Sequence, residues 1–262
     1  MTKAEILRET DLFLLDLDGT VYLDETPIGD MKGTLAALRS AGKRLVYLTN
    51  NSSKTEKEYR EKLKRVGLLE AEDGVYTSGM ATAAMLNARF AGKKVYLLGT
   101  EALKEEFRAA GVALTEESPE IAVLAYDVTL TFEKLKKFNE FLAGGAVYIA
   151  THPDDVCPTK GVPMPDVGSL IALFERSCGR LPDEIVGKPY AAMGGLISVR
   201  YGVPCARCCM VGDRMHTDIR FANNCNMHSI LVLSGETMRE NMGRFPDKPD
   251  LILPDLNAIL EE

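Results

Sequence analysis

Short apolar runs alternate with longer amphipathic stretches along almost all of this 262-residue chain. Residues 12–17 and 45–48 are rich in leucine, valine and aromatic residues, which is typical of strands buried on both faces. Between them, residues 33–41 have apolar side chains at helical spacing and are followed by a glycine, a common residue at a helix end. Strand–helix alternation of this kind predicts an α/β fold with a parallel sheet and right-handed crossovers.

The same alternation continues to the end of the chain. In the middle part we expect strands at 75–77, 95–98, 121–126 and 146–150. We expect helices at 54–66, at 101–110, at 132–142 and near 168–178. A further helix is expected to follow the strand at 75–77 and to end at position 89. The last third predicts a helix at 191–201 and strands at 208–211, 230–233 and 251–253. The pattern therefore favours a core built from both chain ends, with a smaller α/β domain inserted between them.

The composition narrows the range of functions. A hydrophobic fraction of 46% is ample for a large core. The net charge of −7 and the absence of a basic stripe argue against nucleic acid as a partner. The first eleven residues carry charges throughout, and no stretch approaches the roughly 18 apolar residues that a membrane helix needs. We therefore expect a soluble cytoplasmic protein without a membrane segment.

The chain has six cysteines, and Cys205 and Cys208 have the spacing of a zinc site or a redox pair. No second cysteine pair or histidine partner follows at zinc-ribbon spacing. We expect buried or half-buried reduced thiols instead, a common state of free cysteine.

Two aspartates, Asp16 and Asp18, end the first expected strand and precede a glycine. A carboxylate at the edge of a core is costly unless a cation, a proton or hydrogen bonds compensate it. The alternative is a solvated turn, since Asp-Gly is a common turn pair. Ligands of doubly wound sheets bind outside the carboxyl ends of the strands. Reactive side chains follow other expected strands or lie in adjoining loops, namely Thr49, Asn50, Lys188, Asp213 and Asp218.

These residue types fit phosphoryl transfer. Asp16 can act as a nucleophile that forms an aspartyl-phosphate. Asp18, two residues on and on the same side of an extended backbone, can protonate the leaving alkoxide and then deprotonate the attacking water. Thr49 and Asn50 offer neutral donors to phosphoryl oxygens, and Lys188 offers a fixed positive charge against the charge that develops in the transition state.

Asp213 offers an oxygen ligand to Mg²⁺, and Asp218 can support the metal ligands or hold Lys188 in place. Helix capping by residues 51–53, an ordinary surface position for Lys188, and turn or cap roles for the two aspartates are the alternatives. His152 lies in a proline- and aspartate-rich loop after an expected strand and is a candidate phosphate-binding residue, with a surface-loop histidine as the alternative.

Together these segments resemble the four motifs of the haloacid dehalogenase superfamily: DLDGT at 16–20, TN at 49–50, GKP at 187–189 and GDRMHTDI at 212–219. The order is that of the family. The long gap between the second and third motifs resembles the branch with a large α/β cap there, which contains p-nitrophenylphosphatase-like and phosphoglycolate phosphatase-like proteins. The resemblance implies a Rossmann-like, doubly wound core at 1–79 and 183–262 and a cap domain at 80–182.

The resemblance also implies Mg²⁺-dependent hydrolysis of small phosphate monoesters, of the sugar, nucleotide, glycolate or p-nitrophenyl phosphate type. It implies a metal bound by the Asp16 carboxylate, the Asp18 main-chain carbonyl and Asp213. Asp18 favours phosphoryl transfer over dehalogenation, because an alkoxide needs a proton to leave and a halide does not. A phosphotransferase or mutase with the same intermediate and a non-catalytic phosphometabolite-binding regulator are the alternatives. Cap surfaces often pair in similar proteins, so a homodimer is compatible with the resemblance.

Overall fold

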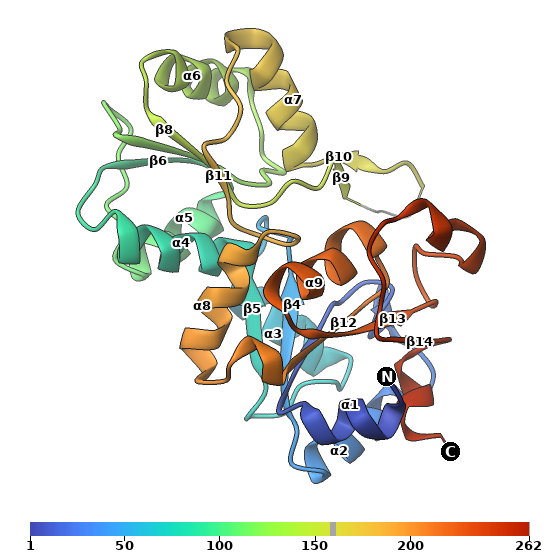
Figure 1. Cartoon of the computed structure of the whole chain (residues 1–262). Helices are drawn as coiled ribbons and strands as arrows, with labels where there is room; N and C mark the ends of the chain where they lie inside the picture. Colours follow the sequence, from blue (N-terminus) through green and yellow to red (C-terminus); the bar gives the residue numbers. More distant parts are fainter. Residues whose placement is uncertain (158–160, 262) are drawn as a thin grey trace. The chain divides into compact units, whose positions relative to one another are not determined.

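The computed structural model describes residues 1–157 and 161–261, which form two compact units (Figure 1). The first unit comprises Met1–Thr49, Lys57–Tyr76 and Lys188–Glu262, and the second unit comprises Asn50–Glu56 and Thr77–Gly187. The short segment Asn50–Glu56 therefore groups with the second unit, although the sequence predicts it in the core. The reason is hydrogen bonding to segments distant in sequence: the Ser52 hydroxyl contacts the Thr151 hydroxyl and accepts from the N–H of Tyr126.

The first unit contains a six-stranded sheet with the order β14-β13-β12-β1-β4-β5. Its strands are β1 (Leu12–Leu15), β4 (Arg44–Thr49), β5 (Gly74–Thr77), β12 (Cys208–Gly212), β13 (His228–Val232) and β14 (Leu251–Leu253). From β1 the chain proceeds to β4 and β5, and it later returns to β12 on the other side of β1. The strand order thus reverses between β1 and β12, which is the switch point of a doubly wound sheet.

Helices flank this sheet and bury its side chains. They are α1 (Lys3–Glu9), α2 (Met31–Ser40), α3 (Glu56–Arg65), α8 (Ala191–Tyr201) and α9 (Arg220–Cys225), with 3₁₀ turns η1 (Cys205–Arg207), η3 (Arg239–Arg244) and η4 (Leu256–Leu260). A short hairpin joins β2 (Tyr22–Leu23) to β3 (Thr26–Pro27). Phe13, Leu15 and Tyr47 belong to a continuous buried cluster that includes residues of α1, α2 and α3. Burial of that apolar surface is the main term that holds the sheet in place.

The second unit has its own sheet and its own core. Its four-stranded sheet has the order β11-β8-β7-β6, with β6 (Val95–Leu98), β7 (Ile121–Leu124), β8 (Val147–Ala150) and β11 (Glu184–Ile185). Its helices are α4 (Ser78–Arg89), α5 (Glu101–Ala109), α6 (Phe132–Ala143) and α7 (Val167–Cys178), and an antiparallel pair joins β9 (Val156–Cys157) to β10 (Met164–Pro165). Phe138 packs on Phe174 and Tyr148, with ring centroids 4.7 Å and 5.5 Å apart. Both units are parallel α/β structures, so the predicted fold class is confirmed.

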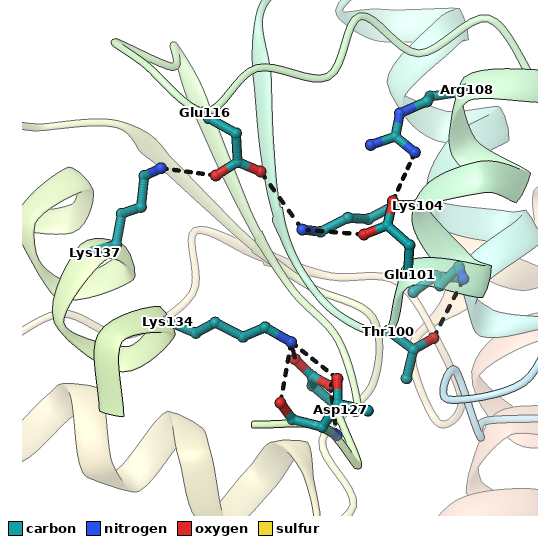
Figure 2. Close-up of polar contacts among 10 residues, drawn as sticks. Thr100, Glu101, Lys104, Arg108, Glu116, Asp127, Lys134 and Lys137 are labelled. Carbon is teal, nitrogen blue, oxygen red and sulfur yellow. Dashed lines mark hydrogen bonds and ion pairs between the residues drawn. The ribbon is translucent and has the colours of Figure 1, made fainter. Parts of the chain in front are cut away.

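Charged side chains of the second unit pair with one another (Figure 2). Lys134 Nζ lies 2.6 Å from the buried Asp127 carboxylate, and Glu116 accepts from Lys137 at 2.7 Å and from Lys104 at 3.5 Å. A cavity of about 70 Å³ lies beside this cluster and is lined by Leu97, Lys104, Arg108, Leu114, Thr115 and Glu116. Because these cations already have carboxylate partners, the cluster offers little free positive charge to a phosphate.

All six thiols are free, three of them buried and three half-buried, as the sequence predicts. Among the described residues, none of the helices combines the length and the apolar character needed to cross a bilayer. The cytoplasmic location stays a prediction.

Candidate active site

Lys188 is completely enclosed at the carboxyl edge of the first unit's sheet. Its side chain is about 2% exposed, and its Nζ donates to Asp16 Oδ1 at 2.6 Å and to Asp218 Oδ1 at 2.7 Å. Burial alone would lower the pKa of Lys188, but the two carboxylates outweigh it and raise that pKa, so the ammonium stays charged. The alternative of an ordinary surface lysine is therefore wrong.

Three carboxylates lie close together here, and two of them, Asp16 and Asp218, contact this ammonium. The ligand atoms of Asp16, Asp213 and Asp218 all lie within 4.8 Å of one another. Asp16 follows β1 and Asp213 follows β12, and these strands are parallel neighbours, so their carboxyl ends meet at one edge. Asp218 comes from η2 (Met215–Ile219), a single π-helical turn of a kind that is frequent at functional sites.

The site has more negative than positive charge. Burial raises the pKa of Asp16 against the opposing effect of Lys188. Burial, with a contribution from Asp16 and Asp218, raises the pKa of Asp213 to about 7. If all three carboxylates are ionised, one ammonium leaves two negative charges uncompensated. A divalent cation would supply that missing charge, since buried charges are paired or coordinate metals.

The carboxylate oxygens of Asp213 are suitable ligands for such a cation. Its Oδ2 accepts from the N–H of Glu236 at 2.7 Å. Its Oδ1 is buried and has no hydrogen-bond partner in the part of the chain that the structure describes. A buried carboxylate oxygen without a partner is rare, and here it lies beside two further carboxylates. Oxygen-only donors of this kind are those that Mg²⁺ prefers.

Asp18 and Thr49 are the other predicted site residues of the first unit, and their roles stay predictions. Asp18 is exposed and lies in the turn after β1, where the N–H of Gly19 donates to the carbonyl of Tyr22 at 2.9 Å. The extended-backbone argument for Asp18 is wrong, because β1 ends at Leu15 and the chain bends before Asp18. Thr49 is buried at the carboxyl end of β4. The exposure of Asp18 suits a group that must meet a leaving oxygen and then a water molecule.

Asn50 and His152 belong to the second unit. The Asn50 amide donates to the Asp154 carboxylate at 3.1 and 3.3 Å. His152 is fully buried, with Nδ1 3.0 Å from the Thr151 hydroxyl and Nε2 3.0 Å from Asp166 Oδ1. The alternative of a surface-loop histidine is therefore wrong. Phosphate binding by Asn50 and His152 stays a prediction.

The loop after β13, residues 234–237, also reaches the site, and the sequence does not single it out. It contributes the Glu236 N–H on Asp213 and a Ser234 hydroxyl that donates to the Gly19 carbonyl at 2.7 Å. The sequence does contain a signal for loop 234–237. Polar residues and a glycine follow an apolar strand there, as they do in the segments that were predicted. Gly212, the last residue of β12, allows a similar close approach, since a Cβ there would lie 2.3 Å from the Asp218 carboxylate.

Comparisons with known proteins identify the family. Residues 13–113 match the haloacid dehalogenase-like hydrolase family, and residues 185–259 match a second HAD-hydrolase-like family. Phosphoglycolate phosphatase 2 from Arabidopsis thaliana is 32% identical over 94% of this chain and 89% of its own length.

Two solved structures extend the similarity to the fold. A 4-nitrophenylphosphatase from Thermotoga maritima superposes with a TM-score of 0.94 at 44% identity and covers 98% of both chains. A glycerol phosphate phosphatase from Mycobacterium tuberculosis, solved in complex with magnesium, superposes with a TM-score of 0.90 at 30% identity and covers 98% of this chain and 79% of that one. The predicted resemblance to this superfamily is confirmed, and the chain belongs to the haloacid dehalogenase-like hydrolases.

Proposed function

We propose that this hydrolase is a Mg²⁺-dependent phosphatase that cleaves small phosphate monoesters through an aspartyl-phosphate on Asp16. The observation that carries the proposal is the buried ammonium of Lys188 between Asp16 and Asp218, beside an Asp213 oxygen that has no protein partner among the described residues. The names of the similar proteins, which are phosphatases of phosphoglycolate, glycerol phosphate and 4-nitrophenyl phosphate, support the same reaction and substrate class.

In the proposed first step, an Asp16 oxygen attacks phosphorus in line and the bond from phosphorus to the ester oxygen breaks. Asp18 gives its proton to that oxygen, so the alcohol leaves neutral. Lys188 and Thr49 hold phosphoryl oxygens, and we assign Asn50 the same role. Magnesium, when bound by Asp16, Asp213 and the Asp18 carbonyl, supplies positive charge against the phosphoryl oxygens.

In the second step, Asp18 removes a proton from water, and the water oxygen attacks phosphorus. The bond between phosphorus and Asp16 breaks, inorganic phosphate leaves, and both aspartates return to their starting states. Atoms and charge balance with water as the only co-substrate. A phosphotransferase or mutase would differ only here, because a second hydroxyl would replace water.

The proposal is tested by measuring phosphate release from a panel of monoesters with Mg²⁺: p-nitrophenyl phosphate, 2-phosphoglycolate, glycerol 3-phosphate and a nucleoside monophosphate. Asp16→Asn is expected to abolish release with the fold intact by circular dichroism. Glu61→Gln, which removes an exposed carboxylate of α3, is the matched control. Near-normal turnover by Asp16→Asn would refute the nucleophile. Transfer to an added alcohol without free phosphate would indicate a phosphotransferase, and tight binding without turnover would indicate a regulator.

A further inference from the structure

The loop after β13, residues 234–237, lies against the Asp213 carboxylate. The N–H of Glu236 donates to Asp213 Oδ2 at 2.7 Å, and the N–H of Thr237 donates to the main-chain carbonyl of Asp213 at 3.2 Å. One carboxylate oxygen is thus held by a backbone amide, while Oδ1 has no partner among the described residues. The Glu236 hydrogen bond occupies Oδ2 and leaves Oδ1 available, and the Thr237 hydrogen bond holds the loop to the Asp213 main chain.

The approach of this loop requires glycine. A Cβ at Gly235 would lie 2.0 Å from Asp213 Oδ2 and 2.5 Å from its Cγ, far inside contact distance. A Cβ at Gly19, whose φ is +89°, would lie 2.6 Å from the same oxygen and 3.0 Å from the Cα of Gly235. Two backbone segments, distant in sequence, therefore converge on one carboxylate because both lack side chains at that point.

The loop is also tied to the turn that carries Asp18. The Ser234 hydroxyl donates to the carbonyl of Gly19 at 2.7 Å. The N–H of Gly19 belongs to the same planar peptide group as the Asp18 carbonyl, and it donates to the Tyr22 carbonyl at 2.9 Å. The direction of the Asp18 carbonyl is therefore set by a turn that Ser234 helps to hold.

Glu236 contacts the segment after β12 through both its main chain, which binds Asp213, and its side chain, which binds Arg214. Its carboxylate Oε2 lies 3.0 Å from Nε of Arg214, the residue directly after Asp213. The pair is half exposed on the Glu236 side, so its contribution is modest by itself. Together with the amide hydrogen bond it fixes loop 234–237 to the segment that follows β12.

We propose that loop 234–237 is a positioning element for the divalent cation, with Gly235 and Ser234 as its essential positions. It holds Asp213 with Oδ1 available and steadies the turn that carries the Asp18 carbonyl. The inference rests on the proposed function, since it takes these two groups as metal ligands. Residues that orient metal ligands typically contribute 10- to 100-fold to metal affinity.

The test is calorimetric titration of the metal-free protein with MgCl₂, without substrate. Gly235→Ala is expected to weaken Mg²⁺ binding by about 10- to 100-fold. Ser234→Ala, which leaves the backbone unchanged, is expected to weaken it severalfold, as loss of one neutral hydrogen bond allows. Gly243→Ala is the matched control, because a Cβ there meets nothing within 4 Å.

Thermal unfolding in EDTA distinguishes a loss of metal-ligand positioning from a general loss of protein stability. The inference predicts that Ser234→Ala unfolds near the wild-type temperature without metal and gains less stability from added Mg²⁺. Wild-type Mg²⁺ affinity in both Gly235→Ala and Ser234→Ala would overturn the inference while leaving the phosphatase intact. A wild-type protein that neither binds Mg²⁺ nor releases phosphate would overturn the proposed function itself, and the inference with it.

Discussion

Replacing Lys188 by methionine tests whether its ammonium holds the Asp16 and Asp218 carboxylates together. The substitution keeps an unbranched side chain but removes two contacts of 2.6 and 2.7 Å. The oxygens of Asp16 and Asp218 would then face each other within 4.8 Å. At an effective dielectric constant of about 20, two like charges at that separation repel by about 3.5 kcal/mol. Removing one partner of a buried ion pair typically costs about 3–5 kcal/mol, which agrees.

The size of this loss depends on pH, and its sign follows from the carboxyl pKa values. Burial raises the pKa of Asp16 in the folded protein, and Lys188 opposes that rise. Without Lys188 the folded-state pKa rises further above the unfolded value. Stability is then lost as the pH rises through the folded-state pKa and recovered as the pH falls below it. We therefore expect the largest destabilisation of Lys188→Met at about pH 8 and a smaller one at about pH 5.5.

The assay is urea unfolding in EDTA at both pH values, with Lys64→Met, an exposed lysine of α3, as the control. The free energy of unfolding of Lys188→Met should fall by about 3 kcal/mol or more relative to the control at the higher pH. Equal stability of the two variants at the higher pH, or a loss that grows as the pH falls, would refute the electrostatic reasoning.

Three further predictions concern activity. EDTA is expected to stop phosphate release and added Mg²⁺ to restore it; metal-independent hydrolysis would contradict the role of Asp213. Asp18→Asn is expected to lower kcat/KM, which reports the first step, by about 10²- to 10⁴-fold for alkyl phosphates and by less for p-nitrophenyl phosphate, whose leaving group needs no proton; equal losses of kcat/KM would argue against Asp18 as the acid. Gly212→Ala is expected to displace the Asp218 carboxylate and lower kcat at unchanged solubility, whereas Gly195→Ala, with open space at its Cβ, should retain kcat.

The central strands could be predicted because burial on both faces leaves a simple signal in the sequence. β1 and β4 lie in the interior of the sheet, and their residues are almost entirely apolar up to the point where the site begins. The polar residues that follow β1, β4 and β12 could be predicted to meet because the topology of a parallel sheet brings strand ends together. The predicted cluster of Asp16, Lys188, Asp213 and Asp218 is what the geometry contains.

Other features depend on contacts between residues distant in sequence. Helix α1 forms from a charged segment because Thr2 and Glu5 make a capping box, a signal weaker than a long periodic stretch. His152 is buried because Thr151 and Asp166 satisfy both ring nitrogens, which no local pattern announces. The role of Gly235 depends on the approach of Asp213, which lies on another strand end.

The central position of β1 has a consequence for the timescale of motion at the nucleophile. All four residues of β1 are buried between β12 and β4, and the amide of Asp16 itself donates to the carbonyl of Val211 at 2.9 Å. Amides in such a strand exchange with deuterated solvent only through the largest openings of the domain. We expect the amide of Asp16 to be among the last to take up deuterium. The attacking carboxylate would then be attached to the slowest-exchanging backbone of the molecule, while Asp18, two residues away, faces the solvent.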